Sequence, residues 1–254
     1  MKNLNAVLIT GASSGIGEAL ALYYAAHGVK TLFLSGRNAE RLQNVADRCR
    51  ALGAEVAPQI IDVTDRSAMQ QWLEKCEAQT PLELVFANAG VSTGAETAEN
   101  IYNTFNTNVM GVLHTITPAI DIYRRRADNK GRKIIAITAS IAGYHGLAAC
   151  PSYSATKACV KAYGEALHNS LKAENIQVNV ICPGFVKSRI TDKNTCPMPF
   201  FMSAEQAAQI IAERIDKNVS LIAFPWPMRL ATWFISILPN RLSDFIYAAL
   251  PHKV

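Results

Sequence analysis

Short, continuously apolar runs alternate with longer amphipathic stretches along this chain. The amphipathic stretches repeat their apolar positions at helical spacing, which predicts helices over residues 15–26, 39–51 and 152–173, among others. The short runs are apolar at successive positions, which predicts strands covered on both faces, as in a parallel sheet. Seven such runs are present: Ala6–Ile9, Thr31–Ser35, Val56–Ile61, Leu84–Ala87, Lys133–Thr138, Val178–Cys182 and Leu221–Phe224. The alternation predicts an α/β fold with a doubly wound parallel sheet.

Composition is compatible with one domain over residues 1–254, because half of the residues are hydrophobic and no repeat or linker-like stretch interrupts the pattern. The net charge is +5, and the densest basic run lies within residues 124–133, at a predicted helix end and turn. No aromatic residue interleaves with this run as a stacking platform. A solvated surface is therefore favoured over contact with nucleic acid.

Cysteine and histidine usage indicates neither a disulfide framework nor a metal site. The six cysteines form no C-x-x-C pair, which fits a reducing cytoplasm. The five histidines lack the spacings typical of metal ligands, so no metal is expected. After Met1 and Lys2 the chain enters its first predicted strand within a few residues, which leaves no room for a signal peptide. These features predict a cytoplasmic location.

A glycine-rich segment, Thr-Gly-Ala-Ser-Ser-Gly-Ile-Gly at residues 10–17, joins the first predicted strand to the first helix. Gly11 permits a tight turn, Gly15 allows the backbone to approach a pyrophosphate, and Gly17 allows the helix to pack closely. The N–H groups at the new helix start face the phosphates. The segment predicts a dinucleotide site formed by Gly11, Ser13, Ser14, Gly15, Ile16 and Gly17.

The end of the second predicted strand reads Ser-Gly-Arg-Asn at residues 35–38. An acidic residue here would accept a hydrogen bond from a free ribose 2'-hydroxyl, whereas an arginine accommodates a 2'-phosphate. No Asp or Glu occurs between Val29 and Ala39, and Arg37 with Asn38 follows a glycine. NADP(H) is therefore favoured over NAD(H). The alternative is that Arg37 is simply an exposed side chain at a turn.

Candidate chemistry lies further along the chain, where Tyr153 and Lys157 are four residues apart and hence neighbours on one helix face. By itself this spacing is equally compatible with two surface residues. Ser140, however, lies just beyond the strand ending at Thr138, at the sheet edge where such folds bind ligands. The helix that carries Tyr153 begins on the same side, so the three groups are expected to converge near the dinucleotide.

Taken together, these motifs resemble the short-chain dehydrogenase/reductase family over about residues 4–188. The resemblance rests on motifs in the family's order: residues 10–17, Asp62-Val63, Asn88-Ala89-Gly90, Asn108, Ser140, Tyr153–Lys157 and Pro183-Gly184. It implies a Rossmann-like subunit with seven parallel strands, a nicotinamide cofactor, and a homodimer or homotetramer. Two positions depart mildly from the family pattern: Ala87 replaces an Asn, and Ser188 stands where Thr is common.

The resemblance also implies roles for individual residues. Asp62 and Val63 would contact adenine, and Asn88, Ala89 and Gly90 would line the adenosine ribose. Pro183, Gly184 and Val186 would meet the nicotinamide and its amide, and Ser188 is also expected to bind the cofactor. Asn108 would hold a water that connects Lys157 to solvent, although an amide that satisfies backbone groups in a helix is the open alternative.

Hydride transfer to a carbonyl carbon leaves an alkoxide that needs a proton from a positioned acid, and Tyr153 is the candidate. An ammonium ~4 Å away at an effective dielectric of ~20 interacts with a phenolate by about 4 kcal/mol, which would lower the phenol's pKa by roughly 3. Lys157 is thus expected to bring Tyr153 near the working pH and to hold the nicotinamide ribose. Ser140 would donate to the substrate oxygen as its charge develops.

These expectations favour an NADPH-dependent reductase of a ketone or aldehyde, and the substrate is a small-molecule carbonyl or alcohol. An alcohol dehydrogenase working in the oxidising direction and a non-catalytic NADP-binding sensor remain alternatives. The four polar groups Asn108, Ser140, Tyr153 and Lys157 favour an enzyme, because a sensor needs no acid.

Two segments near the C-terminus bear on substrate and partner. Residues 187–202 correspond to the family's substrate lid and contain the apolar cluster 197–202, which either contacts a large, lipid-like substrate or packs on the protein's own core. Residues 226–254 form an apolar extension with two of the three tryptophans. Its prolines and Arg229 interrupt it well short of the ~18 residues needed to span a bilayer. A subunit interface, a pocket wall and a peripheral membrane contact all remain open for it.

Overall fold

The computed structural model describes residues 4–126, 131–193, 197–239, 241–242 and 246. Within them, seven parallel strands form one sheet in the order β3-β2-β1-β4-β5-β6-β7. The strands are β1 (Ala6–Ile9), β2 (Thr31–Gly36), β3 (Glu55–Ile60), β4 (Leu84–Ala87), β5 (Ile134–Thr138), β6 (Gln177–Pro183) and β7 (Leu221–Phe224). The predicted α/β class and the doubly wound parallel sheet are confirmed.

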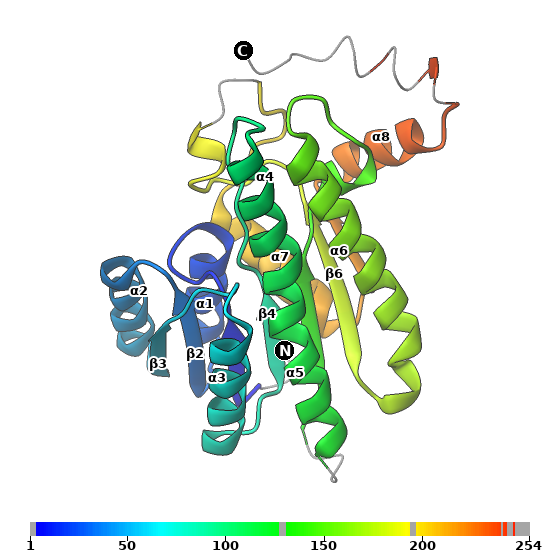
Figure 1. Cartoon of the computed structure of the whole chain (residues 1–254). Helices are drawn as coiled ribbons and strands as arrows, with labels where there is room; N and C mark the ends of the chain where they lie inside the picture. The colour runs from blue at the N-terminus through cyan, green and yellow to red at the C-terminus, as the bar shows by residue number, and fades with distance from the viewer. Residues whose placement is uncertain (1–3, 127–130, 194–196, 240, 243–245, 247–254) are drawn as a thin grey trace.

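Helices cover both faces of the sheet (Figure 1). On one face lie α1 (Gly15–Ala26), α2 (Ala39–Ala51) and α7 (Ala204–Asp216), and on the other lie α3 (Arg66–Gln79), α5 (Gly111–Arg125) and α6 (Pro151–Ser170). The central strands β1, β4 and β5 are buried along their whole length because helices cover both faces of the sheet. Side chains on both faces are therefore apolar. Successive side chains of a strand therefore pack alternately into two separate hydrophobic cores, one under each helical layer.

Element ends follow local sequence signals. Asn38 and Asp65 cap α2 and α3 with their side chains, and Ser203 with Gln206 forms a capping box at the start of α7. The helix predicted over 152–173 is α6, which ends at Ser170 rather than at residue 173. A short 3₁₀ turn at Lys172–Glu174 and a left-handed Asn175 carry the chain into β6.

The sheet reverses its strand order between β1 and β4, and this is where ligands bind in open α/β sheets. Three further elements lie at the carboxyl end of the strands: α4 (Ala98–Phe105), the 3₁₀ turn η2 (Ile141–Tyr144) and α8 (Trp226–Ser236). Figure 1 shows α4 and α8 at this end of the molecule, together with the loop that follows β6.

The basic run at the end of α5 is engaged in ion pairs. Arg124, Arg125 and Arg126 contact Glu174, Glu74 and Glu77, respectively. Among the described residues, no helix has the length and hydropathy to cross a membrane. Residues 194–196 of the predicted lid, and residues 240, 243–245 and 247–254 of the predicted extension, lie outside the described residues.

Candidate active site

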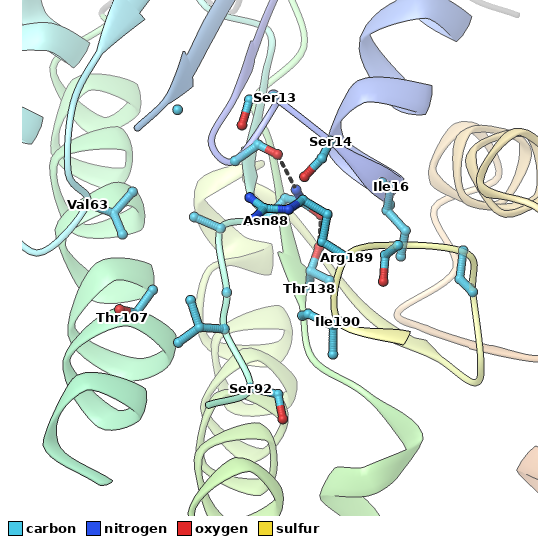
Figure 2. A pocket seen from close by; sticks show the side chains of 18 of the residues that line it. Ser13, Ser14, Ile16, Val63, Asn88, Ser92, Thr107, Thr138, Arg189 and Ile190 are labelled. Carbon is cyan, nitrogen blue, oxygen red and sulfur yellow. Dashed lines mark hydrogen bonds between the residues drawn. The ribbon is translucent and has the colours of Figure 1, made fainter. Parts of the chain in front are cut away.

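A cleft of about 500 Å³ opens at the carboxyl end of the sheet, over the switch between β1 and β4. Figure 2 shows the side chains around it, from Ser13, Ser14 and Ile16 of the glycine segment to Asn88, Thr138, Arg189 and Ile190. The cleft is lined by all but two of the residues that the sequence singles out: Gly11, Ser13, Ser14, Gly15, Ile16, Arg37, Asn38, Asp62, Val63, Asn88, Ala89, Gly90, Ser140, Tyr153, Lys157, Pro183, Gly184, Val186 and Ser188. Gly17 and Asn108 do not line the cleft but contact residues that do, namely Gly11 and Val91, respectively.

The glycine segment turns sharply between β1 and α1. Gly11 and Gly15 have φ values of 67° and 60°, which residues other than glycine rarely adopt. A Cβ on Gly11 would also lie 2.8 Å from the Ala89 Cα. Ser14 precedes α1 and makes no side-chain bond to its first turn, so the helix start presents backbone N–H groups at the cleft.

Gly17 allows the start of α1 to pack closely against the glycine loop. A Cβ at this position would lie 2.3 Å from the Gly11 carbonyl oxygen and 2.6 Å from the Asn88 Nδ2. Asn88 in turn links three strand ends, because its Nδ2 donates to the Thr10 carbonyl at 3.0 Å and its Oδ1 accepts from Thr138 Oγ1 at 3.3 Å. The ends of β1, β4 and β5 are thereby fixed relative to the glycine loop.

Two buried polar atoms near the β2–α2 junction, Ser35 Oγ and Arg41 Nε, have no hydrogen-bond partner among the described residues. Both residues line the cleft. Arg41 lies in the first turn of α2, where its backbone N–H donates to the Asn38 side chain at 2.9 Å. Arg37, by contrast, is largely exposed and lies 3.7 Å from Asp62. Arg41 is thus the more enclosed of the two cations at this end of the cleft.

Tyr153 and Lys157 face the cleft from the first turns of α6, as their spacing predicts. Lys157 Nζ lies 5.7 Å from the centre of the Tyr153 ring and donates to the Thr138 carbonyl at 2.9 Å. Glu96, from the loop before α4, accepts hydrogen bonds from the backbone and hydroxyl of Ser152, at 3.1 and 2.8 Å. This carboxylate fixes the start of α6 next to Tyr153.

The pKa of Tyr153 differs from the expectation. Burial raises it to about 12, and the hydrogen bond with Ser140 opposes that rise. Burial also lowers the pKa of Lys157 to about 8. The expected lowering of the Tyr153 pKa by Lys157 is therefore absent, because the low-dielectric surroundings penalise both the phenolate and the ammonium ion.

Ser140 follows β5 and is nearly enclosed. Its Oγ accepts from the Ala142 N–H at 3.1 Å and lies 3.4 Å from the Pro183 carbonyl oxygen. Asn108 is fully buried in the π-helical turn Asn106–Met110. Its amide bonds both backbone groups of Val91, at 2.8 and 2.9 Å, and donates to Thr156 Oγ1 at 3.1 Å. In this structure Asn108 therefore ties a loop to α6, which is close to the alternative that its sequence context left open.

The segment after β6 closes one side of the cleft. A parallel bridge between Val186 and Met202 joins the two ends of the predicted lid. Met202 packs against the core, whereas Phe200 and Phe201 are 57% and 46% exposed, so these two rings do not pack on the protein's own core. Arg189 and Thr191 also line the cleft, and Thr191 Oγ1 accepts from the Ser188 N–H at 2.8 Å.

Several cleft residues were not identified from the sequence. They are Ser35, Gly36, Arg41, Ile61, Val91, Ser92, Thr107, Thr138, Ala139, Arg189, Ile190 and Thr191. Arg41 could have been found, since it lies four residues after Arg37, in the first turn of the helix predicted over 39–51. No cluster of metal-binding side chains occurs within the part of the chain that the structure describes.

The chain matches the family model described as short chain dehydrogenase over residues 5–197. An uncharacterized oxidoreductase of Myxococcus xanthus is 36% identical over 242 residues, which cover 93% of this chain and 94% of the relative. The 3-oxoacyl-(acyl-carrier-protein) reductase of Thermotoga maritima is 28% identical over 219 residues, 80% of this chain and 87% of that protein.

A solved structure extends the similarity to the whole fold. The short chain dehydrogenase/reductase of Burkholderia phymatum, in complex with NAD, superimposes with a TM-score of 0.81 at 26% identity. The match covers 99% of this chain and 98% of that one.

Proposed function

This chain belongs to the short-chain dehydrogenase family, and we propose that it reduces a ketone or aldehyde to an alcohol with NADPH as the hydride donor. The main support for this proposal is that the candidate catalytic residues and the glycine loop line the same cleft. Ser140, Tyr153 and Lys157 line one end of it, and the glycine loop with Arg41 lines the other. A dinucleotide that spans the cleft would bring its reactive ring to the hydroxyl groups.

The residues of the cleft fit a phosphorylated dinucleotide. Gly11 and Gly15 line the cleft at the start of α1, where the free N–H groups and the helix dipole would favour a pyrophosphate. Ser35 Oγ and Arg41 Nε are buried donors without a partner in the described part of the chain, and a ribose 2'-phosphate would satisfy both. No acidic side chain at the end of β2 is available to bind a free 2'-hydroxyl.

The bound nicotinamide supplies the hydride, and the chain's own residues handle the oxygen of the substrate. Ser140 Oγ and the Tyr153 hydroxyl would both donate to this oxygen, and Tyr153 would release its proton as the alkoxide forms. Lys157, held by the Thr138 carbonyl, places positive charge beside the phenolate that remains. Val91 and Thr156 hold Asn108 behind this group, so we assign Asn108 a positioning role.

The raised pKa of Tyr153 leaves its phenol available as a proton donor. Because burial raises that pKa to about 12, the phenol is protonated at neutral pH and is ready to donate. Oxidation of an alcohol would instead need the phenolate as a base. The relative from Thermotoga maritima is also named as a reductase of an oxo group.

The test is NADPH consumption by the purified protein with aldehydes and ketones of graded chain length and ring size. Tyr153→Phe should abolish turnover and keep NADPH binding, because only the proton donor is removed. A Tyr153→Phe variant that turns over at the wild-type rate would refute this mechanism. NADPH binding without turnover of any compound by the wild type would favour the sensor instead.

A further inference from the structure

Helix α8 carries an apolar face that nothing in the described structure covers. Trp226, Leu230, Trp233, Phe234 and Ile237 are between 51% and 74% exposed. They occupy positions i, i+4, i+7, i+8 and i+11, which fall on one stripe of a helix of 3.6 residues per turn. We call these five residues the α8 stripe.

The opposite side of α8 faces the protein. Met228, Thr232 and Ile235 are half-buried, and they recur at i, i+4 and i+7 on that side. A Cβ on Gly184 would lie 3.1 Å from the Met228 Sδ, and α8 also packs against η2 and β7. The helix is therefore anchored with its stripe outward, beside the residues that line the cleft.

Charge at α8 is positive. Arg229 and Arg241 are both exposed, and residues 217–243 contain no Asp or Glu. A short interfacial helix with Trp and Phe on one side and arginines at its flanks binds at the boundary between lipid headgroups and acyl chains. Its arginines are attracted to anionic headgroups.

We propose that α8 docks the protein on the surface of an anionic lipid bilayer, with the α8 stripe inserted at headgroup depth. A second copy of the chain fits the stripe less well, because a two-fold contact would bring the same arginines of both copies together, with no acidic residue in 217–243 to pair with them. Helix α8 lies at the carboxyl end of the sheet (Figure 1), which is also the end where the cleft opens.

The experiment is vesicle sedimentation of the full-length protein with phosphatidylcholine vesicles that contain or lack phosphatidylserine. The wild type should pellet with the anionic vesicles, and Trp233→Glu should lower its partition coefficient at least about tenfold. The matched control is Leu52→Glu, which places the same charge on a comparably exposed residue at the end of α2 and should bind like the wild type. Arg229→Gln should weaken binding about fivefold, and only to the anionic vesicles.

The readout needs no turnover, so it is independent of the reaction proposed above. Equal pelleting of the wild type and Trp233→Glu, or no pelleting of the wild type, would overturn the proposal. A drop in the mass of Trp233→Glu by light scattering, without vesicle binding by the wild type, would assign the stripe to a second copy instead. Folding of both Glu variants is checked by their circular dichroism and NADPH affinity.

Discussion

Replacing Arg41 by glutamine should weaken NADPH far more than NADH. Arg41 reaches the cleft from the first turn of α2, and its buried Nε has no hydrogen-bond partner in the structure. A 2'-phosphate would satisfy this donor and would also lie near the positive end of the α2 dipole. NADH has a hydroxyl at this position, so it gains little from the guanidinium.

The size of the effect follows from the burial of the donor. A hydrogen bond between charged groups contributes about 1.5–3 kcal/mol, and about 1.4 kcal/mol corresponds to a tenfold change in affinity. We therefore expect Arg41→Gln to raise the Kd for NADPH about 10- to 150-fold and the Kd for NADH less than about twofold.

Fluorescence titration of both dinucleotides with both proteins measures these constants. Arg37→Gln is the matched control, because Arg37 is 59% exposed and its contact with Asp62 at 3.7 Å is open to solvent. Screening limits an exposed charge pair to about 0.2–1 kcal/mol, so this variant should lose about fivefold or less. Equal losses for NADPH and NADH in Arg41→Gln, or a larger loss in Arg37→Gln, would refute the assignment of Arg41.

Three further predictions concern the support of the site. Gly17→Ala should lower the free energy of unfolding in urea by about 1–3 kcal/mol and abolish NADPH binding, because its Cβ would lie 2.3 Å from the Gly11 oxygen. Glu96→Ala should reduce kcat several-fold without changing NADPH affinity, whereas Glu96→Gln, which keeps an acceptor for Ser152, should retain activity. Lys157 has a pKa of about 8 when folded and 10.5 as a free side chain, so the folded state binds fewer protons between those values. The urea stability of the wild type relative to Lys157→Met should therefore rise by about 2 kcal/mol from pH 7.5 to 10, and a flat difference would contradict this.

The strands and the glycine loop could be predicted because their signals are local. A run such as Leu84–Ala87 is apolar at every position only when both faces of its strand are covered, and β4 occupies those residues. The left-handed turns at Gly11 and Gly15 likewise follow from one short segment. The neighbourhood of Tyr153 and Lys157 also needs nothing beyond helix geometry.

Contacts between segments that are far apart in the sequence could not be predicted from such local signals. Asn108 bonds Val91 and Thr156 because a loop and two helices meet there, which no spacing within the sequence encodes. Arg41 lies only four residues after Arg37, yet the packing of α2 against the sheet decides which of the two cations is enclosed. The outward side of α8 is likewise decided by the contact of Met228 with the residues around Gly184.

The pKa of Tyr153 shows why a pairwise charge argument was insufficient. The expectation counted the attraction between a phenolate and an ammonium, which grows as the dielectric falls. Burial that strengthens this attraction also removes the water that stabilises each ion, and for Tyr153 and Lys157 that loss dominates. Burial therefore keeps Tyr153 protonated at neutral pH, and it makes the Lys157 ammonium lose its proton at a lower pH than the ammonium of a surface lysine. A phenol with this raised pKa is a weaker acid than a free tyrosine, so in the proposed reaction its proton passes to the substrate oxygen only as the strongly basic alkoxide forms.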